Sequence, residues 1–128
     1  MNTKLRSIAA VLAATGAAFG ALAIGAPAAQ ASMNDCPASQ ICAWTAPDYK
    51  GYMGHWVGNA ANWNNRIENK DSSWFNNATG TGNTSVRIYT KHNYTGEYFC
   101  LDKGEYDNYD SYWGDKGSSH KWVNPSDC

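Results

Sequence analysis

The chain has 128 residues, with 10 Lys and Arg, 11 Asp and Glu, and a formal net charge of −1. A weakly acidic chain of this length lacks the basic surface that phosphate recognition needs, so nucleic acid is excluded as a partner. Aromatic residues make up 13% of the chain and glycine occupies 12 positions, which favours one small domain of short strands and tight turns.

Residues 1–31 have the features of a secretory signal peptide. Two basic residues precede an alanine-rich apolar run from Ile8 to Ile24, and Ala29-Gln30-Ala31 is a small-x-small cleavage site. The run consists mostly of alanine and glycine, so we expect cleavage after Ala31 rather than a membrane anchor. The sequence therefore predicts a secreted, extracellular protein with a single domain at residues 32–128.

All four cysteines lie in the predicted mature part, where an oxidising compartment favours disulfides. Cys36, Cys42, Cys100 and Cys128 can pair in three ways. We favour Cys36–Cys42, which closes a short N-terminal loop, and Cys100–Cys128, which ties the C-terminus to the second half of the chain. The spacing includes no C-x2-C pair that would point to zinc.

The strands expected after residue 32 are short. No segment sustains the apolar period of a long helix, and Gly, Asn, Asp and Ser separate the apolar runs. The expected strands are residues 41–45, 52–57, 73–77, 85–90, 97–101 and 121–124, with a third strand of each half near 64–67 and 109–112. Residues 76–83, rich in Asn, Gly and Thr, are the expected connector between the halves.

One aromatic pattern occurs twice, 45 residues apart. Trp44–Gly51 and Tyr89–Gly96 both read aromatic-x4-Tyr-x-Gly, and a serine pair follows each copy, at Ser72-Ser73 and Ser118-Ser119. A repeat of this length indicates one supersecondary unit used twice. In such a unit a hairpin folds over its sheet. Glycine allows the bend, the two aromatic rings pack together, and a later serine hydroxyl binds hairpin backbone.

The double pattern resembles the βγ-crystallin Greek-key motif. The resemblance implies an all-β domain of two four-stranded Greek-key motifs, at about residues 40–79 and 84–125, stapled by two disulfides. The signal peptide, the Cys36-x5-Cys42-Ala43-Trp44 segment and the size are also similar to the secreted metalloproteinase inhibitors of actinomycetes, of the Streptomyces type. That similarity implies a secreted metallopeptidase as partner.

The crystallin resemblance further implies a candidate calcium site in each serine loop. The family's stretch, Asn/Asp-Asn/Asp-x-x-Ser/Thr-Ser, corresponds here to Glu68–Ser73 and Gly114–Ser119. Calcium is bound by oxygen ligands, and the candidates are Asn69, Lys70 (carbonyl), Ser72, Asp115, Lys116 (carbonyl) and Ser118. Both stretches depart from the pattern at the first position, so the alternative is that the serines only lock the hairpins. No other cofactor is expected.

The inhibitor resemblance implies a substrate-like segment at the Cys100–Leu101 peptide bond. Thermolysin-like metallopeptidases favour a bulky apolar residue after the scissile bond. Leu101 would therefore fill the protease pocket, with Phe99 and Asp102 beside it. A disulfide at Cys100 would hold the strand and lower the ordering cost of binding. The alternative is that Leu101 is a core residue, and the edge from Tyr49 to Trp56 is then the next candidate.

The leading functional hypothesis is a monomeric, non-enzymatic inhibitor that blocks the cleft of thermolysin-like metallopeptidases. The sequence has no H-E-x-x-H or G-x-S-x-G motif, and its three histidines are too far apart for a local metal motif. The alternative is a calcium-binding or cell-surface-binding crystallin-type module, antimicrobial in the manner of killer-toxin-like proteins. The tyrosine-rich acidic segment 102–115 is either a solvated loop or a recognition surface.

Overall fold

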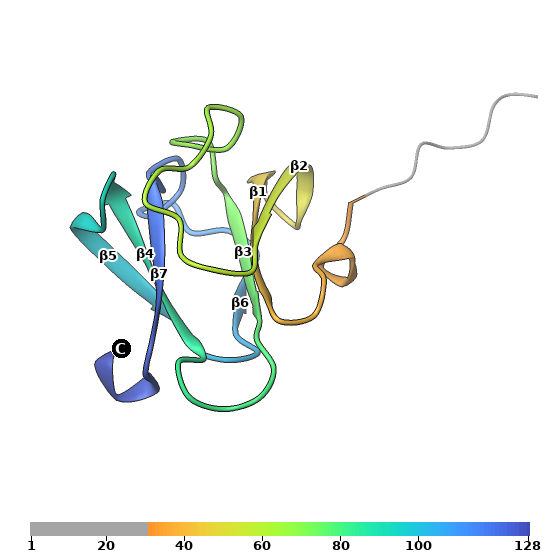
Figure 1. Cartoon of the computed structure of the whole chain (residues 1–128). Coiled ribbons are helices and arrows are strands. Elements are labelled where there is room, and N and C mark those ends of the chain that lie inside the picture. The colour runs from red at the N-terminus through yellow and green to blue at the C-terminus, as the bar shows by residue number, and fades with distance from the viewer. Residues whose placement is uncertain (1–30) are drawn as a thin grey trace, which may run out of the picture.

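The computed structural model describes residues 31–128, which form two antiparallel sheets (Figure 1). The first sheet has the order β2 (Lys50–Trp56), β1 (Gln40–Ala46), β3 (Ser73–Asn77) and β6 (Tyr106–Asp107). The second has the order β5 (Thr95–Leu101), β4 (Ser85–Lys91) and β7 (Ser119–Val123). Two 3-10 helices lie near the ends of the domain, η2 (Met33–Asp35) and η3 (Pro125–Asp127).

One expectation about the start of the chain concerns residues that the structure does not describe. The predicted signal peptide, residues 1–31, lies outside the described residues except for Ala31. Within the described part, no helix is long and apolar enough to cross a membrane.

The six main strands expected from the sequence are present, with ends that differ by two residues at most. The third strand of each half was expected in the wrong place. Residues 64–67 and 109–112 lie in loops and turns. The observed segments are β6 in the second half and a single bridge from Ala60 to His120 in the first. These segments are too short to show a period of apolar residues in the sequence. Their position depends instead on the strand with which they pair.

The two halves exchange these short segments. β6 belongs to the second half but pairs with β3 of the first, with Trp74 opposite Asp107. Ala60 of the first half pairs in turn with His120 on β7. Since each half completes the sheet of the other, the two Greek keys form one folding unit rather than two independent ones.

The aromatic pattern folds each hairpin over its sheet as expected. In the first half, the rings of Trp44 and Tyr49 meet edge to face at 5.2 Å. Gly51 has a φ of +83°, and a Cβ there would collide with Thr45 Oγ1. Ser73 Oγ accepts from Tyr49 N at 3.0 Å and donates to Ala46 O at 2.9 Å. The second half repeats the arrangement with Tyr89, Tyr94, Gly96 and Ser119. The second serine of each pair therefore locks the hairpin.

Two apolar clusters hold the sheets. The larger lies between them and contains Ile41, Ala43, Trp63, Ile67, Trp74, Val86, Ile88 and Leu101. Ile41 and Ala43 of β1, and Val86 and Ile88 of β4, reach this cluster from alternate positions, because successive side chains of a strand point to opposite faces of its sheet. The smaller cluster contains Cys36, Cys42 and Trp44. Both expected disulfides, Cys36–Cys42 and Cys100–Cys128, are present.

A histidine is buried at the junction of the halves. Trp63 Nε1 donates to His120 Nδ1 at 2.9 Å, and His120 Nε2 lies 2.7 Å from Gly58 O. Nδ1 therefore accepts and Nε2 carries the proton, so the ring is neutral. Burial lowers the pKa of His120 from 6.5 to about 4, although the hydrogen bond to Gly58 opposes this change.

The His120 interaction predicts loss of stability in acid. The pKa is about 6.5 in the unfolded chain and about 4 in the folded one, so the unfolded chain takes up a proton first as the pH falls. The contribution of His120 to the free energy of unfolding is complete above pH 6.5 and decreases by up to about 3 kcal/mol as the pH falls to 4.

Urea unfolding of the wild type and of His120→Gln at pH 7.5, 5.5 and 4 measures this effect. The glutamine variant should be less stable at pH 7.5, and the difference between the two proteins should shrink toward pH 4. A difference that stays constant over this range would contradict the assignment of a neutral, pKa-lowered His120. The other ionisable groups are common to both proteins and cancel in the comparison.

Candidate functional site

β5 is a free edge of the second sheet and is strongly exposed. Its residues from Thr95 to Tyr98 are all exposed to solvent. The Cys100–Cys128 disulfide ties the end of the strand to the C-terminus. Arg87 of β4 lies over the Tyr98 ring at 4.5 Å and donates from Nε to Asp127 O at 3.0 Å. This edge therefore presents an extended, exposed strand that the disulfide and the Arg87 contacts hold in place.

The fold buries part of the predicted inhibitory segment, which consists of Phe99, Cys100, Leu101 and Asp102, and leaves part of it exposed. Leu101 is 4% exposed and belongs to the main core, and the Phe99 ring packs against Trp74 and Trp113, each at 5.0 Å. Asp102 is exposed and accepts from Ser85 Oγ at 2.6 Å. The burial of Leu101 argues against its predicted role, because a core side chain cannot enter a protease pocket while the domain stays folded.

The two serine loops bind each other reciprocally. Asn69 N donates to Gly117 O at 2.8 Å, and Asp115 N donates to Asp71 O at 2.6 Å. Asn69 and Asp115 both have left-handed backbone conformations, with φ of 56° and 61°, which Asn and Asp tolerate better than most residues. Each loop thus satisfies backbone groups of the other.

Asp71, which the sequence analysis did not single out, is the centre of this contact. Its carboxylate is fully buried and accepts from Trp74 Nε1 at 2.7 Å and from Gly117 N at 2.8 Å. Burial raises the pKa of Asp71 to about 6, while the hydrogen bonds from Gly117 and Trp74 lower it. A Cβ at Gly117 would overlap Trp63 and the Asp71 carboxylate. One local signal was available: Trp74 follows Asp71 by three residues, and a buried indole N–H needs an acceptor.

The structure brings together only some of the candidate calcium ligands. Ser118 Oγ lies 3.2 Å from Asn69 Oδ1, so these two side chains bind each other. Ser72 Oγ points instead to Thr45 O at 3.4 Å. Glu68, at the first position of the stretch, pairs with His92 at 2.6 Å.

The other loop offers even less to a cation. Asp115 is exposed, and the Lys116 side chain lies with its ammonium 3.8 Å from the centre of the Tyr112 ring. In the first loop, Lys70 Nζ donates to Asn65 O at 2.5 Å. Among residues 31–128, no three His, Cys, Asp or Glu side chains come together as a metal site. Calcium takes six to eight oxygen ligands, so the residues present fit it poorly and calcium binding stays a prediction.

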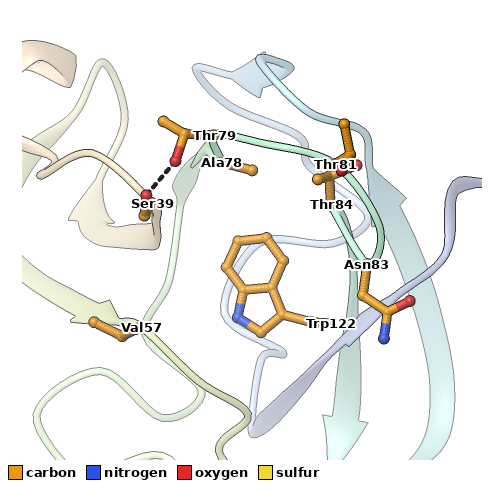
Figure 2. Close-up of a pocket in the computed structure, with 8 residues that line it drawn as sticks. All are labelled: Ser39, Val57, Ala78, Thr79, Thr81, Asn83, Thr84 and Trp122. Carbon is orange, nitrogen blue, oxygen red and sulfur yellow. Dashed lines mark hydrogen bonds between the residues drawn. The ribbon is translucent and has the colours of Figure 1, made fainter.

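A small pocket lies elsewhere, between the connector of the two halves, β7 and the segment after β2 (Figure 2). Its volume is about 160 Å³, and the Trp122 ring stands among the hydroxyl groups of Thr79, Thr81 and Thr84. A Ser39–Thr79 hydrogen bond closes one side. Trp122 Nε1 is buried without a hydrogen-bond partner in the described part of the chain. No charged side chain lines the pocket, and none of the inhibitory or calcium-binding residues predicted from the sequence lies in it.

The sequence model of peptidase inhibitor family I36 matches residues 29–101, more than half of the chain. No curated protein gives a significant match.

Solved structures show the fold. A βγ-crystallin structure concerned with the evolution of the eye-lens domain is 16% identical with a TM-score of 0.59, and the match covers 70% of this chain and 90% of that one. An archaeal βγ-crystallin is 17% identical with a TM-score of 0.55, over 68% of this chain and 100% of that one. One from Ciona intestinalis is 16% identical with a TM-score of 0.53, over 65% and 98%. The predicted βγ-crystallin fold is confirmed.

The burial of Leu101 predicts that Leu101→Asp unfolds the domain. An unpaired carboxylate in the core should remove at least about 3 kcal/mol of stability. The matched control is Tyr98→Asp on the same strand, where the side chain is 41% exposed. Circular dichroism and thermal melting should show a folded control and a largely unfolded Leu101 variant. A Leu101→Asp protein with the same melting temperature as the wild type would show that this side chain is accessible.

The hydrogen-bonded serine loops predict a weak calcium response. A ligand that binds only the native state raises the melting temperature. Because Asn69 and Ser118 already bind each other and Ser72 binds Thr45 O, 5 mM calcium should raise the melting temperature by no more than about 2 °C, corresponding to a few tenths of a kcal/mol. Melting the wild type, Asn69→Ala and Asp115→Ala with calcium or magnesium measures this. A larger rise that is specific for calcium and lost in either variant would establish a calcium site.

Proposed function

The chain belongs to peptidase inhibitor family I36, and we propose that it inhibits secreted metallopeptidases of the thermolysin type by blocking their active-site cleft. The inhibitor resemblance seen in the sequence agrees with this membership, and the role of a non-enzymatic peptidase inhibitor follows from the family. The metallopeptidase target, the thermolysin-like specificity and the monomeric state belong to the proposal.

The exposed edge formed by β5 is the observation that carries the proposal. The unpaired N–H and C=O groups of an edge strand can extend a second protein's sheet. Peptide segments bound in this way are extended, as β5 already is. The surface from Thr95 to Tyr98 would therefore enter the cleft, while Leu101 anchors the strand in the core.

Rigidity explains how such a strand would inhibit rather than serve as a substrate. β5 pairs with β4 from Val86–Leu101 to Lys91–Thr95, so a cleaved strand would be held in place by its neighbour. The Cys100–Cys128 disulfide adds a covalent tie. A preformed segment loses little conformational entropy on binding, which raises affinity.

The two disulfides also support an extracellular target. Disulfides persist in oxidising compartments, and the domain contains two, Cys36–Cys42 and Cys100–Cys128. The alternative function, a calcium-binding or cell-surface module, is less well supported because the serine loops fit calcium poorly.

Inhibition assays with two single variants test the proposed edge. The mature protein, residues 32–128, should inhibit a thermolysin-like metallopeptidase and leave a serine protease unaffected. Tyr98→Ala on β5 should weaken inhibition about tenfold or more, since a central aromatic contact is commonly worth over 1 kcal/mol. His55→Ala, an exposed position on the β2 edge, is the matched control and should stay within about twofold.

The outcomes separate the target from the surface. Absence of inhibition at micromolar concentration of the wild type would refute the metallopeptidase target. A loss of inhibition in the β2 variant with an unchanged β5 variant would move the contact to the edge from Tyr49 to Trp56.

A further inference from the structure

Three tyrosines that lie close together in the sequence are strongly exposed. Tyr106, Tyr109 and Tyr112, here called the tyrosine face, are 61%, 53% and 53% exposed. They lie within seven residues, on β6 and in the loop that follows it. Clustered exposed aromatic rings on a small domain mark an interaction surface more often than isolated ones do.

Hydrogen bonds hold the backbone of the tyrosine face in one conformation. Asp107 Oδ1 accepts from Tyr109 N at 3.0 Å. Asp110 Oδ1 accepts from Tyr112 N at 2.7 Å and from Trp113 N at 3.0 Å. The rings are therefore presented at a low cost in conformational entropy, as tyrosines are in binding loops of antibodies.

The tyrosine face adjoins the proposed inhibitory edge at Tyr112. Tyr112 Oη donates to the Glu97 carboxylate of β5, at 3.1 and 3.2 Å from its two oxygens. Trp113 packs against Phe99 of the same strand at 5.0 Å. A protein that covers β5 would therefore meet Tyr112 and the loop that carries Tyr109, whereas the Tyr106 ring lies toward the first hairpin, 6.5 Å from the Tyr49 ring.

The charges around the tyrosine face are mainly negative. The segment from residue 102 to 116 carries five acidic residues, namely Asp102, Glu105, Asp107, Asp110 and Asp115. Its two lysines already bind other groups. Lys103 Nζ donates to Gly80 O at 2.6 Å, and the Lys116 ammonium lies over the Tyr112 ring. A complementary partner is positively charged.

The tyrosines of this domain already bind cations through their ring faces. Lys116 lies 3.8 Å from the centre of the Tyr112 ring, and Arg87 lies 4.5 Å from that of Tyr98. Within residues 31–128, no Lys or Arg covers the ring of Tyr106 or Tyr109. These two rings remain free for a cation supplied by another molecule.

We propose that the tyrosine face binds an arginine- or lysine-bearing segment at the rim of the target peptidase's cleft. This inference rests on the proposed function in taking a peptidase as the partner. Tyr106 and Tyr109 would receive the cationic side chains on their ring faces, and the surrounding carboxylates would attract them over a longer range.

Inhibition measured at two salt concentrations tests the proposal. Tyr106→Ala and Tyr109→Ala should each weaken inhibition about tenfold, whereas Tyr109→Phe, which keeps the ring face, should stay within about threefold. The inhibition constant of the wild type should rise about tenfold between 50 and 500 mM NaCl, because salt screens the attraction between the charges and slows association. Val57→Ala, 69% exposed but away from this face, is the control. A wild type that inhibits while both alanine variants stay within twofold would overturn the inference and leave the proposed function intact.

A titration without any peptidase covers the case in which no metallopeptidase is inhibited. The probes are the peptide acetyl-Arg-Ala-Arg-Ala-amide and its analogue with citrulline in place of arginine. Amide NMR signals of Tyr106, Tyr109 and their neighbours should move with the arginine peptide only, and this response should be lost in Tyr109→Ala. An equal response to citrulline, no response at millimolar peptide, or signals that move elsewhere would overturn the proposal.

Discussion

The buried carboxylate of Asp71 connects the two halves of the domain. It accepts one hydrogen bond from Trp74 in its own half and one from Gly117 in the other. A buried carboxylate is costly unless it is fully hydrogen-bonded, so this arrangement tolerates little change in the distance between the halves. The loops that carry the two serine pairs are placed by the same contact, and the serines in turn lock both hairpins.

This contact has a consequence for function. The serine loops are the positions where the crystallin resemblance implied calcium, but here their polar groups bind one another. Asn69 and Ser118 meet across the two halves, and Glu68 pairs with His92. The loops therefore hold the two halves of the domain together, and the proposed partner surfaces, the β5 edge and the tyrosine face, lie elsewhere.

The β5 edge and the tyrosine face supply two different kinds of contact. The strand offers backbone hydrogen bonds, which depend little on sequence, whereas exposed rings and carboxylates discriminate between partners by charge. The hydrogen bonds from Tyr112 to Glu97 join the two surfaces. An inhibitor built in this way would gain affinity from the strand and selectivity from the loop beside it.

Features that depend on neighbouring residues could be predicted from the sequence. The repeated aromatic-x4-Tyr-x-Gly pattern predicted the two hairpins and the βγ-crystallin fold, and the short apolar runs bounded by Gly, Asn, Asp and Ser located six strands. The burial of Leu101, the pairing of Ala60 and β6 with the opposite half, and the hydrogen bond from Gly117 to Asp71 became visible only in the folded structure. Each of these depends on a partner distant in sequence, and local periodicity carries no information about which distant segment will lie opposite.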